Sequence, residues 1–251
     1  MKVNLLTHTP DPDKIIAAAA KLCYSSSGID DIMDNLTDEA IQKFMDMLMS
    51  LGHESPVEHV TFTFGIEGIS RACSHQLVRH RIASYSQKSQ RYVSEDGFEF
   101  IIPPSIKDNP EALDKFMKTM EIIQTSYDKV RSLIKSSISR NENLDIKSAE
   151  KRANEDARFL LPNACETKII VTMNIRSLFN FFKHRCCNRA QWEIRAVAME
   201  MLRLCMEVAP NIFRHAGPDC VAKGQCNEGK MTCGKGLEMR STFAKLYVDN
   251  K

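Results

Sequence analysis

The sequence predicts an α+β protein in which a mixed sheet of few strands is flanked by long helices. Several long stretches repeat apolar residues every three or four positions, the spacing of one helix face, and a few short stretches alternate apolar and polar residues as strands do. The strand-like stretches do not alternate regularly with the helical ones. This irregular order favours α+β over a doubly wound parallel sheet.

The alternating pattern of a strand occurs in residues 2–7, 61–69, 98–102 and 168–176. The last of these segments, KIIVTMNIR, alternates most clearly. Every second residue from Ile169 is apolar and shares one face, whereas Asn174 and Arg176 share the other face. We therefore expect this strand to have one buried face and one face with polar side chains.

The helical segments have recognisable ends. Thr37-Asp38 is a start signal, and Gly52 ends the apolar pattern that follows it. From Pro110, one apolar face continues for about six turns of 3.6 residues. The predicted helices cover residues 15–22, 38–52, 110–134, 145–161 and 190–208.

The composition is that of an ordinary globular protein. The 251 residues include 34 Lys+Arg and 32 Asp+Glu, so the net charge of +2 does not draw the chain to nucleic acid or to a membrane surface. No apolar run approaches the roughly 20 residues of a membrane span, and the first residues lack the pattern of a signal peptide. We expect a cytoplasmic protein with one domain at 1–215 and a loosely ordered tail at 216–251 that contains Gly, Lys and Cys.

Nine cysteines in a chain without an export signal are expected to be free thiols. In the tail, Cys220, Cys226 and Cys233 have the spacing Cys-x5-Cys-x6-Cys. This spacing lacks the paired cysteines of structural zinc sites, so incidental thiols and no metal are expected. Cys186 and Cys187 have basic neighbours, which lower thiol pKa values, but packing is the favoured interpretation of this pair.

The most unusual segment is 76–92, QLVRHRIASYSQKSQRY. It contains five basic residues among Ser and Gln and has no carboxylate to neutralise them. Guanidinium groups match phosphate oxygens in bidentate geometry, and Ser and Gln add neutral hydrogen bonds. A solvated helix face would normally mix both charge signs, so a phosphate or polyanion site is the preferred interpretation.

Two further groups of polar residues stand out. In HESPVEH, residues 53–59, two His and two Glu suggest a metal site, but the His residues are six positions apart and cannot form an i, i+4 zinc pair on one helix face. Asn174, Arg176, Asn180 and Arg185 form the other group, which suits a nucleobase edge or a phosphate. For any one of these residues, or for Arg158, an ordinary surface or capping role is about as plausible.

Several blocks of the sequence together resemble one family. Arg79-His80-Arg81, then seven residues and Ser89, matches the RHR-x7-S signature of the flavin-dependent thymidylate synthases, ThyX. HESPVEH resembles the family's HE(T/S)PxEH segment, and FEFIIP, ARFLLP, NIRSLFNF and AQWEI resemble family blocks in the family's order. Together these blocks cover roughly residues 50–210, which the resemblance identifies as part of a single ThyX-like catalytic domain.

The resemblance implies an enzyme that methylates dUMP to dTMP. The carbon donor would be 5,10-methylenetetrahydrofolate, the hydride would come from FAD reduced by NADPH, and tetrahydrofolate would be released. It also implies a homotetramer with active sites shared between subunits. Because the flavin supplies the hydride, no cysteine nucleophile is required, and Ser89 is expected to position the substrate.

The resemblance also assigns site residues, with Arg185 as the catalytic group that polarises the uracil. The residues implied to bind FAD are His53, Ser55, Arg79, His80, Arg81, Gln87, Asn174, Ile175, Arg176 and Asn180. Those implied to bind dUMP are Gln76, Leu77, Val78, Arg79, Gln87, Lys88, Ser89, Gln90, Arg91, Arg158 and Arg185. No metal ligand is implied.

The sequence departs from the family at a few positions and leaves two other functions open. Gln87 stands where some members have Glu, and Arg189 stands where others have His near the flavin. A nucleic-acid-binding protein could use the segment 79–91 as a phosphate-tracking patch, but few aromatic residues are interleaved with its cations. A metal-dependent hydrolase could be built on the residues of 53–59. Neither alternative explains the block 174–185.

Overall fold

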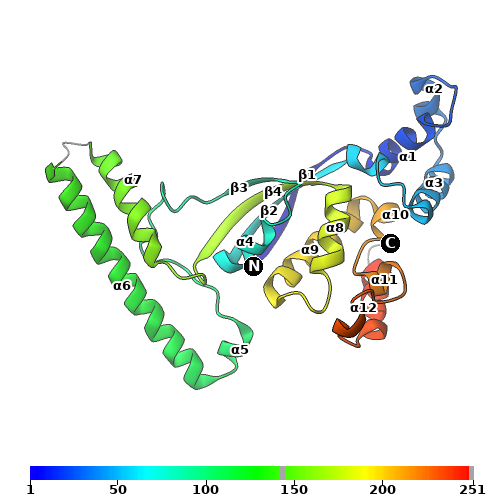
Figure 1. The fold of residues 1–251 in the computed structure, drawn as a ribbon. Coiled ribbons are helices and arrows are strands. Elements are labelled where there is room, and N and C mark those ends of the chain that lie inside the picture. The colour runs from blue at the N-terminus through cyan, green and yellow to red at the C-terminus, as the bar shows by residue number, and fades with distance from the viewer. Residues whose placement is uncertain (142–144, 249–251) are drawn as a thin grey trace. The chain divides into compact units, whose positions relative to one another are not determined.

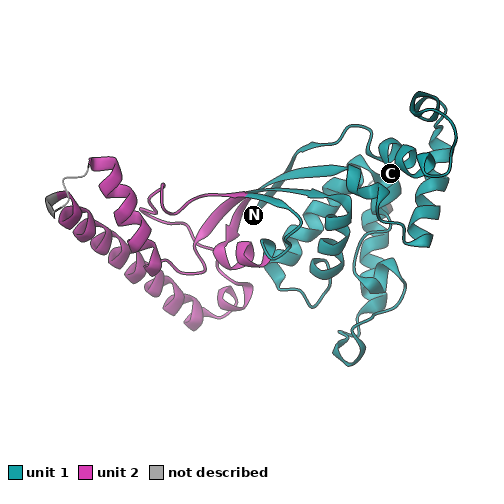
Figure 2. Ribbon diagram, turned by 45° about the horizontal axis from the view of Figure 1, so that its top comes forward, with its two compact units in different colours: residues 1–66, 77–85, 170–251 teal, residues 67–76, 86–169 magenta. Residues whose placement is uncertain are grey.

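The computed structural model describes residues 1–141 and 145–248 (Figure 1). The chain divides into two compact units (Figure 2). Unit 1 contains residues 1–66, 77–85 and 170–251, and unit 2 contains residues 67–76 and 86–169. The segment 76–92 that stands out in the sequence therefore contributes to both units.

The strands form a four-stranded sheet with the order β1-β2-β4-β3. They are β1 (Lys2–His8), β2 (Thr61–Ser70), β3 (Ser84–Gln87) and β4 (Glu166–Asn174). In β2 and β4, alternate apolar side chains such as Phe62 and Val171 are fully buried. On the other face, the hydroxyl groups of Thr63 and Thr172 are 2.9 Å apart and hydrogen-bonded. A small sheet with many helices confirms the predicted α+β class.

In unit 1, the N-terminal helices are α1 (Pro12–Leu22), α2 (Ile29–Asp34) and α3 (Asp38–Leu51), and the 3-10 turn η1 (Pro56–His59) follows them. The predicted ends of α3 are correct. The Thr37 hydroxyl accepts a hydrogen bond from the Ala40 N–H, and Gly52 ends the helix with a positive φ of 68°.

The core of unit 1 joins β2 to α8 (Ile175–Arg185), α9 (Trp192–Val208) and α10 (Pro210–Phe213). The Phe213 ring contacts Phe62 edge-on, with ring centroids 5.4 Å apart, and Phe182 with centroids 6.1 Å apart. All three rings are fully buried. This aromatic contact fixes α8 against the sheet, and α8 carries several of the predicted site residues.

In unit 2, α6 (Pro110–Asn141) and α7 (Ile146–Ala157) lie side by side as a helical hairpin (Figure 1). Polar bonds join them: Arg131 donates to the Asn154 Oδ1 at 2.6 Å, and Lys135 pairs with Glu150 at 2.5 Å. The unit also contains α5 (Pro104–Lys107), η2 (Arg158–Leu160) and most of α4 (Arg71–Leu77). No helix among the described residues is long and apolar enough to cross a membrane.

Two predicted strand assignments are wrong. Residues 98–102 form no strand, and only a single bridge joins Phe100 to Cys165. The Phe98 N–H instead donates to the Gln124 side chain on α6 at 2.8 Å, so this segment packs on a helix. The other error is at the end of β4, where Ile175 and Arg176 belong to the first turn of α8 and not to the strand.

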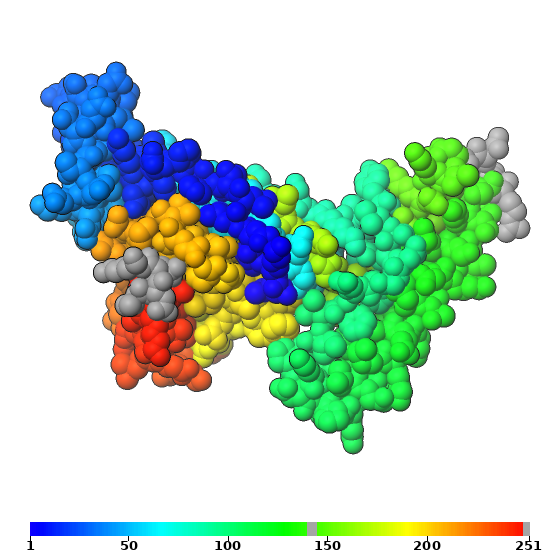
Figure 3. Space-filling view, turned by 180° about the vertical axis from the view of Figure 1, so that it is seen from behind, coloured from blue at the N-terminus to red at the C-terminus, as the bar shows by residue number. Residues whose placement is uncertain are grey.

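The tail also differs from the prediction of a loosely ordered segment. It contains α11 (Asp219–Ala222), η3 (Gly229–Met231) and α12 (Gly236–Val248). The Phe243 side chain is fully buried, and the Tyr247 hydroxyl donates to the Ala216 carbonyl at 2.8 Å. In Figure 3 the tail, orange to red, forms part of the surface of unit 1. Its helix α12 also contacts α9, because the Arg195 side chain lies 3.5 Å from the sulfur of Met239.

The packing of α12 gives a prediction about stability. Phe243→Ala should lower the free energy of unfolding of unit 1 by about 3–5 kcal/mol, the usual cost of removing a buried aromatic ring. Urea or thermal unfolding followed by circular dichroism measures this loss. Leu237→Ala is the control on the same helix, because its side chain is 78% exposed. Equal stability of the two variants would mean that α12 does not pack on the unit.

Candidate functional site

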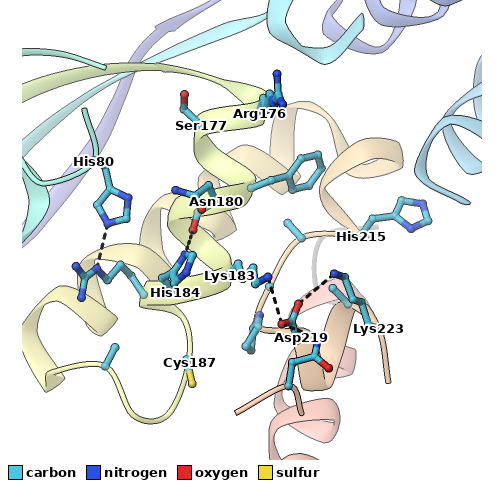
Figure 4. Close-up of a pocket in the computed structure, with 18 of the residues that line it drawn as sticks. His80, Arg176, Ser177, Asn180, Lys183, His184, Cys187, His215, Asp219 and Lys223 are labelled. Atoms are coloured by element: carbon cyan, nitrogen blue, oxygen red, sulfur yellow. Dashed lines mark hydrogen bonds and ion pairs between the residues drawn. The ribbon is translucent and has the colours of Figure 1, made fainter. Parts of the chain in front are cut away.

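The main cavity of unit 1 has a volume of about 1100 Å³ and lies beside α8 (Figure 4). Its walls come from four parts of the unit: the segment 79–82, the region 174–190 around α8, residues between 215 and 228, and Met49, Glu54 and Glu58. The predicted site residues that line it are Arg79, His80, Arg81, Asn174, Arg176, Asn180 and Arg185. The structure thus brings together seven residues that the sequence places in two separate blocks.

The cavity is built on the start of α8. Asn174 is the last residue of β4 and caps the helix, because its Oδ1 accepts the Ser177 N–H at 2.9 Å. A helix N-terminus carries a partial positive charge and favours anions. From this start, Arg176, Asn180 and Lys183 follow at helical spacing and line the same cavity (Figure 4).

Arg176 is held by two carboxylates from the segment around η1. Its Nε donates to Glu54 at 3.0 Å and its Nη1 donates to Glu58 at 2.5 Å. The hydrogen bond with Glu58 is the main reason that the pKa of Arg176 lies above its usual value. His53 and Ser55 of this segment are exposed and do not line the cavity. Nor are any three His, Cys, Asp or Glu side chains in residues 1–141 and 145–248 arranged to hold a metal ion.

At the other end of α8, Arg185 contacts His80. The Arg185 Nε donates to the His80 Nε2 at 3.1 Å, and the His80 ring stands edge-on to Phe181, with centroids 4.9 Å apart. Burial, followed by the positive charges of Arg185 and His184, lowers the pKa of His80 to about 4. His80 is therefore neutral near pH 7, and its Nε2 accepts the hydrogen bond from Arg185.

Tyr85 holds the loop that carries His80 through hydrogen bonds. The Tyr85 hydroxyl lies 2.8 Å from the His80 carbonyl and 2.9 Å from the Leu77 carbonyl, and burial raises its pKa to about 12. Leu77 is fully buried and Val78 is 36% exposed. Ile175, another predicted site residue, is also fully buried. Leu77 and Ile175 can therefore contact a ligand only through their backbone.

In unit 2, three predicted site residues are engaged by internal bonds. The Gln87 amide donates to the hydroxyls of Ser74 at 2.9 Å and Thr167 at 3.1 Å. Lys88 pairs with the buried carboxylate of Glu95 at 2.8 Å. Similarly, Gln90 lies 3.6 Å from a cysteine sulfur, that of Cys165. Their side chains shape the segment that carries the remaining candidates, and Gln76 is half-buried at the end of α4.

Arg91 and Arg158 meet around one residue of α7. Arg91 forms an ion pair with the Glu155 carboxylate at 2.8 Å, and the Arg158 Nε donates to the Glu155 carbonyl at 3.2 Å. The Ser89 hydroxyl accepts the Arg91 N–H at 3.3 Å. The Arg91 Nε is buried and has no hydrogen-bond partner, but the side chain as a whole is 39% exposed, so an incoming anion can reach the guanidinium from outside.

Sequence reasoning missed several residues of these sites. In unit 2, burial lowers the pKa of Arg71, and the positive charge of the nearby Arg158 lowers it further. Arg71 begins α4, immediately before the segment that was singled out, and its cationic character was the available signal. The other missed residues line the cavity of unit 1 and are Lys183, His184, His215, Asp219 and Lys223. Three of these come from the segment 215–223, which has no recognisable motif.

The cysteine pair after α8 is explained by packing. Cys186 is fully buried, and this burial raises the pKa of its thiol well above the usual value, although Arg195 opposes the rise. Basic neighbours therefore do not make Cys186 reactive. Cys187 is half-buried and lines the cavity beside Arg189.

Comparison with known proteins identifies relatives along nearly the whole chain. Residues 4–211 match the profile of a family described as thymidylate synthase complementing protein. A flavin-dependent thymidylate synthase from Clostridium tetani is 55% identical over 243 residues, which is 97% of each chain. One from Geobacter sulfurreducens is 52% identical over 250 residues, covering 99% of this chain and 100% of its own.

A solved structure supports the fold. The flavin-dependent thymidylate synthase ThyX of Helicobacter pylori, complexed with FAD and dUMP, superposes with a TM-score of 0.58 at 24% identity. The match covers 86% of this chain and 100% of the other chain. At this identity, the likeness establishes the shared fold.

The contact between His80 and Arg185 gives a prediction about pH. His80 should titrate near pH 4 in the folded protein instead of near 6.5. The unfolded chain then binds the proton more readily, so the contribution of His80 to stability is complete above pH 6.5 and is lost as the pH falls towards 4. Titration of the imidazole signals by NMR measures the pKa, and Arg185→Ala should raise it. A pKa near 6.5 in the wild type would contradict the described contact.

Proposed function

The chain belongs to the flavin-dependent thymidylate synthases, FAD-using methyltransferases that form dTMP from dUMP, and we propose that two groups of its side chains carry this reaction. One group lines the cavity of unit 1 and binds FAD. The other surrounds Arg91 in unit 2 and binds dUMP. The observation that carries the proposal is the Arg185–His80 contact at the wall of a cationic cavity.

The chemistry of the unit 1 cavity suits FAD. Its volume of about 1100 Å³ is of the size that holds a large cofactor. It is lined by more cations than carboxylates, and the positive end of α8 lies at it, so the diphosphate of a dinucleotide finds favourable charge there. The cations that line it are Arg79, Arg81, Arg176, Lys183, Arg185, Arg189 and Lys223.

The proposed FAD contacts differ in kind. Arg79, His80 and Arg81 form one wall, Asn174 lies at the end of β4, and Arg176 and Asn180 present side chains from α8. For Arg176 to bind a phosphate, the anion must share the guanidinium with Glu54 and Glu58 or replace one of them. His53, Ser55, Ile175 and Gln87 complete the proposed set. Ile175 fixes the start of α8 through its N–H bond to the Val60 carbonyl, and Gln87 orients its neighbours.

For dUMP, the proposed phosphate site is the arginine pair around Glu155. Guanidinium groups bind phosphate through two parallel hydrogen bonds, and the Arg91 side chain is exposed enough, at 39%, for such a contact. Arg158 is bonded to the carbonyl of Glu155, the residue whose carboxylate pairs with Arg91, and the Ser89 hydroxyl accepts the Arg91 N–H. We propose that Gln76, Gln87, Lys88 and Gln90 of unit 2 complete the set of this unit. The other proposed dUMP contacts, Leu77, Val78, Arg79 and Arg185, belong to unit 1 and are expected to meet the substrate in the active sites shared between subunits.

Arg185 is the proposed catalytic residue. When bound, FAD supplies the reducing hydride. The protein's task is then to orient the substrate and to stabilise negative charge on the uracil ring, and a fixed cation at the ring does this without reorganisation. Neutral His80 holds the Arg185 Nε in place and leaves the outer nitrogens of the guanidinium for the substrate.

The remaining partners are proposed on chemical grounds. NADPH would reduce the flavin, and 5,10-methylenetetrahydrofolate would supply the carbon. We also propose a cytoplasmic homotetramer with shared active sites. Large apolar side chains on the surface of unit 2 support this assembly, since Phe159 is 83% exposed and Ile122 is 65% exposed.

The reaction itself is tested by anaerobic incubation of the protein with dUMP, methylenetetrahydrofolate, FAD and NADPH, followed by mass spectrometry. We expect dTMP together with tetrahydrofolate, because the hydride comes from the flavin. Formation of dihydrofolate would show that folate is the reductant and would contradict the proposed route.

Arg185→Ala should retain FAD and lose activity. The predicted fall in the rate of dTMP formation is about 100- to 1000-fold, the usual effect of removing one group that stabilises developing charge. Bound flavin is measured by absorbance after denaturation. Arg203→Ala is the matched control, because this arginine is paired with Glu200 and Glu207 on α9, outside the cavity. Normal turnover of the Arg185→Ala protein would remove this residue from the mechanism.

Arg91→Ala should weaken dUMP binding. The loss of charged hydrogen bonds worth about 1.5–3 kcal/mol raises Kd about 10- to 100-fold. Isothermal titration calorimetry with dUMP measures this change. Arg91→Lys should restore part of the affinity, because lysine keeps the positive charge but cannot form the two parallel hydrogen bonds of a guanidinium. Lys118→Ala, which breaks an exposed ion pair with Asp114 on α6, is the control. Unchanged affinity in the Arg91→Ala protein would place the phosphate elsewhere.

A further inference from the structure

We propose that Cys187, Cys220, Cys226 and Cys233 form a tetrathiolate site for a structural zinc ion. The site would fasten the tail of unit 1 where it forms one wall of the cavity. This inference goes beyond the methyl-transfer reaction and does not depend on it. It changes the expectation that the tail cysteines are incidental, because the structure supplies a fourth thiol from outside the tail.

The four thiols come from two parts of unit 1 that meet. Cys187 follows α8, whereas Cys220 lies on α11 and the other two lie in the loop 223–235 between α11 and α12. Cys187, Cys220 and Cys226 line the same cavity. Burial is the main reason that the pKa of Cys220 is raised, and its three partner thiols add to the rise, which places all of them in its surroundings. All four are free thiols in the structure.

Polar bonds fold the loop back towards Cys187. Arg189, two residues after Cys187, donates to the Met231 carbonyl of the loop. At the base of the loop, the Arg240 guanidinium donates to the Cys220 carbonyl at 3.2 Å and to the Gly224 carbonyl at 2.9 Å. These contacts close the loop between α11 and α12 into a compact turn.

The loop has almost no core of its own. Every residue from 222 to 235 is exposed except Cys233, which is half-buried. Gly224, Gly229 and Gly234 all have positive φ, at 73°, 52° and 73°, so the backbone turns sharply beside Cys226 and Cys233. A segment that buries so little apolar surface needs another source of stability, and a structural zinc ion supplies it directly.

The charges near the thiols suit this metal site. A zinc ion with four thiolates has a net charge of −2, and cations stabilise thiolates. Arg189 and Lys223 line the same cavity as three of the cysteines, and Lys230 and Lys235 lie in the loop. Four sulfur ligands without oxygen or nitrogen select zinc over hard cations such as Mg²⁺.

The sulfurs must converge when the ion binds. In the part of the chain that the structure describes, no three His, Cys, Asp or Glu side chains already have the arrangement of a metal site. Structural zinc sites commonly couple binding to folding in this way, because the site does not exist before the metal arrives. We therefore expect zinc to order the loop and to stabilise α12.

The test is the zinc content of the full-length protein, purified under reducing conditions without chelator and measured by mass spectrometry of the metal. We expect about one zinc ion per chain. Cys226→Ser and Cys233→Ser should each lose most of the zinc. Cys23→Ser should keep it, because Cys23 is an exposed thiol at the end of α1. Wild-type protein that neither retains zinc nor takes it up when reduced would overturn the proposal, as would equal zinc in all variants.

A second measurement uses the wild-type chain and so does not depend on the folding of variants. Removal of the metal with a chelator should increase hydrogen exchange in α12 and lower Tm, and ZnCl₂ but not MgCl₂ should restore both. Cobalt(II) in place of zinc should give the visible bands of tetrahedral thiolate coordination. Disulfides among the four cysteines of freshly purified protein, or iron with inorganic sulfide in place of zinc, would refute the zinc site.

Discussion

The side-chain cap at Asn174 is the interaction on which the geometry of the cavity depends. This residue ends β4, and its Oδ1 accepts the Ser177 N–H in the first turn of α8, so strand and helix change over at one position. The N–H of Ile175, the first residue of α8, donates to the Val60 carbonyl at 3.0 Å, which ties the changeover to the segment before β2. With the start of α8 fixed in this way, its helical period decides which side chains reach the cavity. The same rigid helix places Arg185 at its far end against His80.

The electrostatics of the two candidate sites share one property. Several of their arginines already have carboxylate partners, as Arg176 has with Glu54 and Glu58, and Arg91 has with Glu155. Both partnerships are only partly buried, so the attraction is moderated by water and an incoming phosphate can compete for it. The carboxylates keep the guanidinium groups oriented in the meantime. When a phosphate binds at these sites, it therefore replaces a carboxylate as the partner of the arginine. This exchange costs less free energy than bringing unpaired cations together around an anion.

Much of the fold could be predicted from local signals. Thr37 and Gly52 mark the ends of α3, because capping depends on residues that are close in sequence. The helical period of α6 is recognisable because it repeats over many turns. The segment 98–102 misled because alternation gives the period of a strand but not its partner, and Gln124 on α6 takes the Phe98 N–H. Tertiary contacts likewise decide that the tail folds into helices. Phe243 finds its buried environment only in the folded unit.

The sequence could predict which residue types bind a ligand, but not which of these residues lie together in the fold. The cations of 76–92 were recognisable as ligands for an anion, but the chain divides within this segment, so Arg79 belongs to unit 1 and Arg91 to unit 2. Arg71 and Lys183 carried no motif and became visible only through their neighbours.

The close approach of Phe243 to Gly217 has an evolutionary consequence. Gly217 has a φ of 133°, and a Cβ at this position would lie 2.8 Å from the Phe243 ring. The backbone conformation and the ring thus both require glycine. Among natural relatives that share this packing, a change at position 217 should occur only together with a smaller residue at position 243 and a rebuilt turn. The two positions are therefore expected to vary as a pair, linking the turn before α11 to α12, and both lie beyond the region 4–211 that the family profile matches.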